Sequence, residues 1–166
     1  MKQLIVTMMA MLACVSVGAA DAVWLHDFEA AKAQAKKEGK PIFINFTGSD
    51  WCGWCIKLEK EVFKKKEFQE YAKEHLVLME VDFPNKKELA EEVKKQNEKL
   101  DKEYKIEGYP TLFLLDADGK KLTDDIGYRE GGPEAYVAHL KSLLEKKADG
   151  EPSSQPPSEK VVEKKE

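Results

Sequence analysis

The sequence has few cysteines, few histidines and no excess of positive charge. Three cysteines and three histidines occur among 166 residues, and the formal net charge is −4. A surface that binds nucleic acid through its phosphates is normally basic, so a nucleic-acid partner is disfavoured. Zinc usually has four protein ligands, and the chain has no second closely spaced cysteine pair and no paired histidines. A metal site is therefore disfavoured as well.

Long hydrophobic runs are also absent, apart from one near the N-terminus. The run "LIVTMMAMLACVSV" (4–17) follows the basic start "MKQ" and precedes the small residues "GAA" before Asp21. It is too short for a comfortable transmembrane helix, and the order of these segments is typical of a secretory signal. We therefore expect residues 1–20 to be a signal peptide. The mature protein is then extracytoplasmic, either periplasmic or secreted, where disulfides persist.

Cys14 offers a second interpretation of this segment. "MLAC" loosely resembles a bacterial lipoprotein signal, in which the cysteine is acylated and becomes the first residue. Met11 is a poor match to the leucine usual in such signals, and a further apolar stretch follows Cys14 where a polar tether is common. We expect Cys14 to be discarded with the signal, which leaves Cys52 and Cys55 as the cysteines of the mature chain.

The remaining sequence predicts one α/β domain over residues 21–147 and a disordered tail over 148–166, which is rich in proline, serine and charge. Helices are expected at 26–40, 58–65, 66–76, 86–104 and 131–147. Strands are expected at 41–47 and 76–82, followed by a hairpin over 108–128 around the Asp-Gly turn, with 22–25 as a candidate edge strand. Helices separate the first strands, which should run parallel, whereas the hairpin adds an antiparallel pair. The expected fold is a mixed central sheet with helices on both faces.

The stretch "GSDWCGWCIK" (48–57) joins a strand to a helix and contains both remaining cysteines. At a helix N-terminus, unpaired amides and the helix dipole stabilise a thiolate at Cys52. Cys55, one turn on, can reach Cys52 to close a disulfide, so the pair suits thiol–disulfide exchange. A purely structural bridge would restrain the unfolded chain little, because its loop is so short. Haem attachment fails because Ile56 stands where a histidine is required.

Two motifs together give a family resemblance. "WCGWC" (51–55) after a strand and "GYPT" (108–111) before another resemble the thioredoxin-fold thiol–disulfide oxidoreductases, in particular secreted bacterial thioredoxin-like proteins. The resemblance covers roughly residues 22–147 and implies a thioredoxin-like three-layer sandwich. It also implies that Cys52 is the nucleophile, that Cys55 resolves the mixed disulfide, and that Pro110 is cis and faces both cysteines. The expected substrate-binding residues are Trp51, Gly53, Trp54, Tyr109, Pro110 and Thr111. For Tyr109 the alternative is that it only fills a gap in the core.

The resemblance further implies how the protein would work. The Cys52–Cys55 disulfide carries the electrons, so neither a metal nor an organic cofactor is needed. The partners would be protein or peptide thiols and disulfides, together with an electron donor such as a membrane shuttle, and the chain would act as a monomer. Reduction is the expected direction, although the residues leave oxidase and isomerase activity open. The alternative is a binding module of the same fold, without turnover, for a metal such as Cu(I) or for a partner protein.

The sequence also departs from the family pattern. Asn45 stands where a buried acid is usual, and Leu78 stands where a lysine is usual. An asparagine cannot accept a proton at neutral pH. The proton of Cys55 must then leave through water or another carboxylate, and Asp50 and Glu59 are candidates. The helix expected at 86–104 is longer than the plain thioredoxin core requires.

Overall fold

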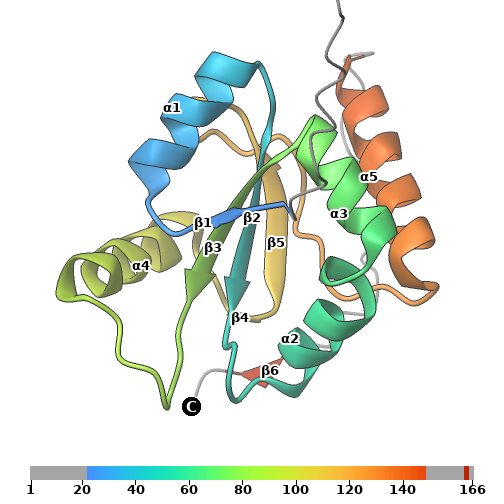
Figure 1. The fold of residues 1–166 in the computed structure, drawn as a ribbon. Helices are drawn as coiled ribbons and strands as arrows, with labels where there is room; N and C mark the ends of the chain where they lie inside the picture. The colour runs from blue at the N-terminus through green and yellow to red at the C-terminus, as the bar shows by residue number, and fades with distance from the viewer. Residues whose placement is uncertain (1–21, 149–162, 165–166) are drawn as a thin grey trace, which may run out of the picture.

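A computed structural model describes residues 22–148 and 163–164 of the chain (Figure 1). The expected signal peptide, Cys14, and most of the expected disordered tail lie outside the described residues. The disorder of the tail stays a prediction, although residues Glu163–Lys164 form a short strand, β6. Among the described helices, none is both long enough and apolar enough to cross a membrane.

A four-stranded mixed sheet forms the centre of the domain (Figure 1). Its strands are β1 (Trp24–Leu25), β3 (Val77–Asp82), β2 (Ile42–Thr47) and β5 (Thr111–Leu115), in that spatial order. The first three run parallel and β5 runs antiparallel to β2. All six residues of β2 are buried, as is typical of a strand covered on both faces. The predicted parallel strands, antiparallel addition and edge strand are confirmed.

Helices cover both faces of this sheet, which confirms the three-layer sandwich. The helices are α1 (Phe28–Glu38), α2 (Gly53–Leu58), α3 (Lys66–His75), α4 (Glu91–Tyr104) and α5 (Gly132–Ala148), and a π-helical turn, η1 (Glu59–Phe63), continues α2. One core lies between the sheet and α1 with α4, and includes Ile44 and Phe46. The other lies between the sheet and α2, η1, α3 and α5, and includes Phe43. Alternate residues of β2 therefore supply different cores.

The local signals for α1 are confirmed. Asp27 caps the helix by accepting a hydrogen bond from the backbone N–H of Ala30 at 2.8 Å. Gly39 ends it with φ of 67°, and its N–H donates to the carbonyl of Ala35. A side chain at this left-handed φ is strained, so the glycine is required there.

The helix predicted to begin at residue 86 begins instead at Glu91. The backbone N–H groups of Asn85 and Lys86 donate to the carboxylate of Asp50, at 2.8 and 2.7 Å, which holds residues 83–90 in a loop. Leu89 therefore lies outside the helix. The inner face of α4 buries Leu100 together with Asn97, whose side-chain amide donates to the carbonyl of Asp82 at 2.9 Å.

The second strand of the predicted hairpin is reduced to isolated bridges, at Leu112–Ile126 and Leu115–Lys121. Between these bridges the backbone N–H of Leu114 donates to the hydroxyl of Thr123, at 3.0 Å. A side chain thus takes the place of a backbone carbonyl, and the ladder is interrupted. The hairpin prediction is wrong on this point, because a local side-chain hydrogen bond competes with strand pairing.

Candidate active site

Cys52 and Cys55 form a disulfide at the start of α2. Cys52 is the N-cap residue and is fully buried, and Cys55 is 5% exposed. The backbone N–H of Cys55 points at the sulfur of Cys52, with 3.1 Å between the nitrogen and Sγ. A donor in this place stabilises a thiolate more than a neutral thiol, so the geometry favours ionisation of Cys52 in the reduced protein.

The loop before the cysteines is fastened to the loop that follows β3. The hydroxyl and the backbone N–H of Ser49 donate to the carboxylate of Asp82, at 2.6 and 2.9 Å. The indole N–H of Trp51 donates to the carbonyl of Phe83 at 2.7 Å. Gly48 is required here, because a Cβ atom at this position would lie 2.4 Å from the indole of Trp51. These contacts hold Cys52 in register with the sheet.

The Tyr109–Pro110 peptide bond is cis, as the resemblance implied. Tyr109 follows Gly108 in the short strand β4 (Gly108–Tyr109) and is fully buried. Its ring meets the indole of Trp51 edge-on, with centroids 5.8 Å apart, and stacks on Phe83 at 5.4 Å. The disulfide, Tyr109 and Trp51 therefore belong to one packed cluster.

Thr111 and Pro110 are buried behind this cluster. The hydroxyl of Thr111 donates to the carbonyl of Gly108 at 2.8 Å, across the cis peptide. The hydroxyl of Tyr109 donates to Asp101 at 3.2 Å, and burial raises the pKa of this tyrosine above its ordinary value. Tyr109 and Thr111 thus use their polar groups inside the protein.

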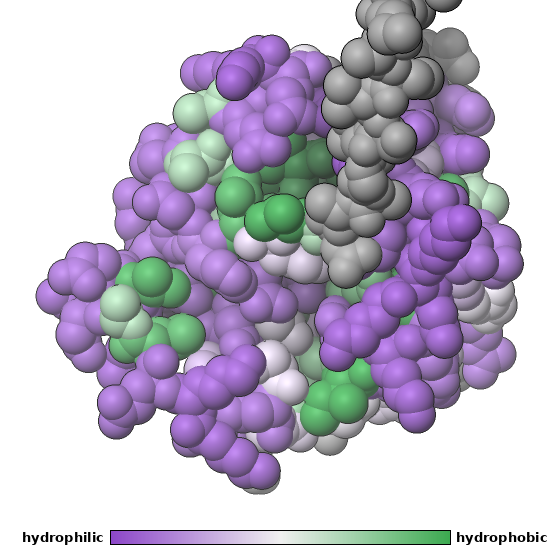
Figure 2. Space-filling model, viewed as in Figure 1, coloured by the Kyte–Doolittle hydropathy of each residue, from purple (hydrophilic) through white to green (hydrophobic). Residues whose placement is uncertain are grey.

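Gly53 and Trp54 lie on the solvent side of the disulfide, where Gly53 is exposed and Trp54 is half-buried. The ring of Trp54 tilts against Tyr128 with centroids 5.3 Å apart. The amine of Lys57 lies over both rings, 4.9 Å from the centroid of Trp54 and 4.5 Å from that of Tyr128. Figure 2 shows a mostly hydrophilic face with small, separate hydrophobic patches. Sequence reasoning missed Tyr128, which comes from the irregular segment before α5.

β4 also pairs with the tail strand β6, antiparallel, with Gly108 opposite Lys164 and Tyr109 opposite Glu163. The backbone edge next to the cis peptide is therefore able to accept an extended segment. Antiparallel pairing of this kind is a common way for proteins to bind peptides.

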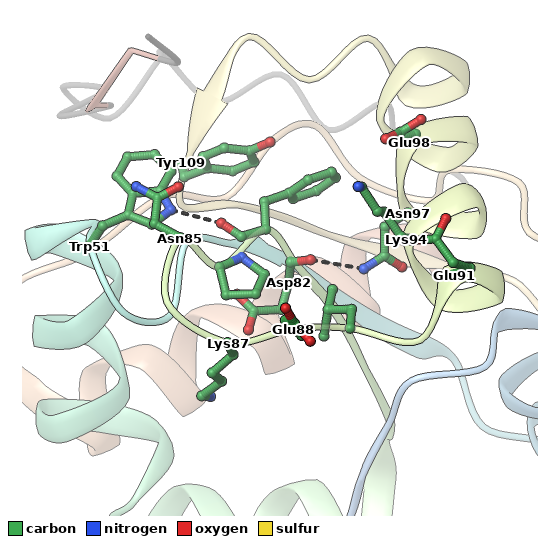
Figure 3. A pocket seen from close by; sticks show the side chains of 13 residues that line it. Trp51, Asp82, Asn85, Lys87, Glu88, Glu91, Lys94, Asn97, Glu98 and Tyr109 are labelled. Atoms are coloured by element: carbon green, nitrogen blue, oxygen red, sulfur yellow. Dashed lines mark hydrogen bonds between the residues drawn. The ribbon is translucent and has the colours of Figure 1, made fainter.

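A pocket of about 550 Å³ opens beside this cluster, between Trp51, the loop after β3 and α4 (Figure 3). In the close view Trp51 and Tyr109 lie at one end, and Lys94 and Glu98 of α4 lie at the other. The pocket exists because residues 83–90 form a loop rather than the first turns of the helix. The extra length of this region thus shapes a surface next to the disulfide.

A second cavity, of about 410 Å³, lies behind the disulfide and includes Cys55 in its lining. Asn45 and Glu80 line it from neighbouring positions of β2 and β3. The pKa of Glu80 is raised from 4.5 to about 7, chiefly by burial and also by the nearby carboxylates of Asp82 and Glu59. Sequence reasoning missed Glu80, although an acid with apolar residues on both sides, inside the strand "LVLMEVD", was a signal of it.

Asp50 and Glu59, the two proton acceptors expected from the sequence, differ from Glu80 in their surroundings. Asp50 accepts hydrogen bonds from the amides of Asn85 and Lys86, and its pKa is held below the ordinary value chiefly by the first of these bonds. Asp50 does not line the cavity behind the disulfide, whereas Glu59 does. Among the described residues, no group of three or more histidine, cysteine or acidic side chains is placed to hold a metal ion.

The sequence model of the thioredoxin-like domain matches residues 28–143. The chain belongs to the thioredoxin-like family. The resemblance to thioredoxin-fold thiol–disulfide oxidoreductases is thereby confirmed, over the region that carries both motifs.

Individual members of the thioredoxin-like family agree with this assignment. The chain is 41% identical over 128 residues to the disulfide bond reductase DsbH of Chlamydia pneumoniae. The aligned region covers 77% of this chain and 76% of that protein. A solved structure of DsbH oxidoreductase superposes with a TM-score of 0.72, at 41% identity, over 78% of this chain and 89% of that one. The solution structure of a thioredoxin from Thermus thermophilus shares the fold at 16% identity, with a TM-score of 0.56 and coverage of 78% and 94%.

Proposed function

We propose that the protein reduces disulfides of proteins or peptides in an extracytoplasmic compartment, with Cys52 as nucleophile and Cys55 as resolving cysteine. The observation that carries this proposal is the placement of the Cys55 amide 3.1 Å from the sulfur of Cys52, at the start of α2. The 41% identity to a protein named as a disulfide bond reductase supports the direction of the reaction. The apolar segment at residues 4–17 supports the compartment.

The reaction proceeds in two exchanges. The Cys52 thiolate attacks one sulfur of the substrate disulfide, a mixed disulfide forms, and the other substrate sulfur leaves as a thiolate. Cys55 then loses its proton and attacks the sulfur of Cys52, which closes the Cys52–Cys55 disulfide and releases the second substrate thiol. The substrate gains two electrons and the protein loses two. A dithiol donor, such as a membrane shuttle, must return them, and no metal or organic cofactor takes part.

The substrate segment docks in an extended form along β4, beside Pro110. The pairing of β6 with this edge supports that role, because it is the same backbone geometry that a substrate strand would use. Gly53 is exposed and adds no side chain above the buried Cys52, and the half-buried rings of Trp51 and Trp54 offer apolar contact to the segment. Tyr109 and Thr111 shape this groove from below through their internal hydrogen bonds.

Reduction of insulin with dithiothreitol as electron donor tests the proposal. We expect the mature protein to accelerate the precipitation of reduced insulin, and its reduction potential to lie nearer to about −270 mV than to about −120 mV. A potential near the upper value without insulin reduction would instead indicate an oxidase. Tight binding of Cu(I) without any turnover would favour the binding-module alternative.

Removal of the tail tests the docking edge. Because β6 occupies the edge that a substrate strand would use, we expect deletion of residues 149–166 to lower the KM for a protein substrate by about two- to tenfold, with kcat little changed. Glu163→Pro keeps the tail but removes one backbone N–H, so it should act in the same direction. Reactivity toward a small aromatic disulfide should not change. An unaltered KM in both variants would contradict docking at β4.

A further inference from the structure

Cys55 must lose its proton before it can attack the mixed disulfide, yet it is 5% exposed. Its side chain faces a cavity that also contains two carboxylates, Glu59 and Glu80. The cavity is the place from which a proton acceptor can reach this sulfur. The inference that follows rests on the proposed function, because it concerns the second of the two exchanges.

The other polar groups near the disulfide are already engaged or unsuited. The carboxylate of Asp82 accepts two hydrogen bonds from Ser49, and that of Asp50 accepts two from backbone amides. Glu59 has a side chain that is 40% exposed and lies 3.7 Å from the amine of Lys64. Glu59 therefore already faces a cation and is open to solvent.

Glu80 lies deeper, with a side chain that is 25% exposed, and one of its carboxylate oxygens lies 3.8 Å from Nδ1 of His26. It sits directly opposite Asn45 in the parallel register of β2 and β3, so the two side chains share one face of the sheet. The side-chain oxygen of Asn45 is buried and finds no hydrogen-bond donor among the described residues. A protonated Glu80 carries an O–H donor, whereas an ionised Glu80 has none. The side-chain oxygen of Asn45 can therefore accept a hydrogen bond from the protonated form of Glu80.

We infer that the Glu80 carboxylate accepts the proton of the Cys55 thiol during resolution, in the place that Asn45 cannot fill. The S–H bond of Cys55 breaks and its proton moves to Glu80. An electron pair of the Cys55 sulfur forms the bond to the Cys52 sulfur. The bond between Cys52 and the substrate breaks, and the substrate sulfur leaves as a thiolate with the electron pair of that broken bond. When a donor dithiol later opens the Cys52–Cys55 disulfide, Glu80 returns the proton to Cys55.

The proton affinity of Glu80 suits this exchange. Its pKa of about 7 brings proton transfer from a thiol close to balance, which is the condition for efficient general-base catalysis. The charged or titratable groups around it come from several elements, namely His26 before α1, Glu59 and Lys60 of η1, Lys64, Asp82 of β3 and Lys87 of the following loop. Lys87 lowers the pKa of Glu80, against the larger effects of burial and of the neighbouring carboxylates.

Reaction of the reduced protein with the aromatic disulfide DTNB separates the two exchanges. Attack by Cys52 releases one thionitrobenzoate, and resolution by Cys55 releases a second. We expect Glu80→Gln to leave the first release within about twofold and to slow the second on the order of a hundredfold at pH 7. The rate of the second release in the unaltered protein should rise with pH through about 7, and this inflection should be lost in the variant.

Glu74→Gln removes one charge from the exposed surface of α3 and should leave both releases unchanged. If Glu80→Gln is poorly folded, Glu80→Ala with added acetate replaces it, because a small carboxylate in the cavity should restore the second release. The inference would be overturned if the second release in Glu80→Gln kept the rate and the pH inflection of the unaltered protein. It would also be overturned if Glu59→Gln lost the second release while Glu80→Gln kept it. Failure of the unaltered protein to give the first release would instead overturn the proposed function.

Discussion

Replacement of Cys52 by serine is expected to reduce insulin reduction to the rate of the uncatalysed reaction. The serine hydroxyl does not ionise near neutral pH, so the amide of Cys55, 3.1 Å from the sulfur in the native protein, has no anion to stabilise. No mixed disulfide can then form at this position. The measurement is the turbidity of reduced insulin with dithiothreitol as donor, together with the mass of the protein after exposure to a disulfide peptide.

Cys55→Ser is the matched control, because it removes the same disulfide and one sulfur from the same cluster. This variant retains the nucleophile and should stop after the first exchange, so a covalent adduct with the peptide accumulates at Cys52. Any loss of activity that arises only from weaker folding would affect both variants alike. Adduct formation by Cys52→Ser, or turnover that survives in it, would refute the assignment of the nucleophile.

The parts of the site that were predictable from sequence are those in which the chemistry is local. Cys52 and Cys55 are one helical turn apart at a strand-to-helix junction, so the sequence predicted that they could form a disulfide at the start of a helix. The N-cap at Asp27 and the end of the helix at Gly39 were likewise predictable, because both residues directly flank α1. The cis bond before Pro110 required the resemblance, because an X–Pro bond alone does not specify its isomer.

The parts that escaped prediction depend on partners distant in sequence. The sequence predicted Asp50 as a candidate proton acceptor, but its carboxylate accepts hydrogen bonds from backbone amides 35 and 36 residues away. Asn97 is buried, and its side-chain amide donates to the carbonyl of Asp82, 15 residues away in the sequence. Glu80 faces the cavity of Cys55 only because β2 and β3 pair in a particular register. A one-residue shift in that register would place a different residue opposite Asn45.

The buried carboxylate of Glu80 should also make the free energy of unfolding of the oxidised protein depend on pH. Its pKa is raised from 4.5 to about 7 in the folded state, so the folded protein holds this proton more tightly than the unfolded chain does. Between these two values the unfolded chain binds fewer protons, and the free energy of unfolding therefore falls as the pH rises. Above about 7 the whole destabilisation is present, and it amounts to about 2 to 3 kcal/mol.

Glu80→Gln removes this titration and keeps the size of the side chain. Any cost of burying the amide does not depend on pH, so it cancels when the difference in unfolding free energy between variant and unaltered protein is compared at pH 4 and pH 8. We expect that difference to shift in favour of the variant by about 2 to 3 kcal/mol on going to pH 8, measured by urea unfolding of the oxidised proteins. Glu74→Gln, on the exposed surface, should show no such shift. Parallel stability profiles for Glu80→Gln and the unaltered protein would mean that Glu80 ionises at its usual pH, and a carboxylate of that kind would be a poor acceptor for the Cys55 proton.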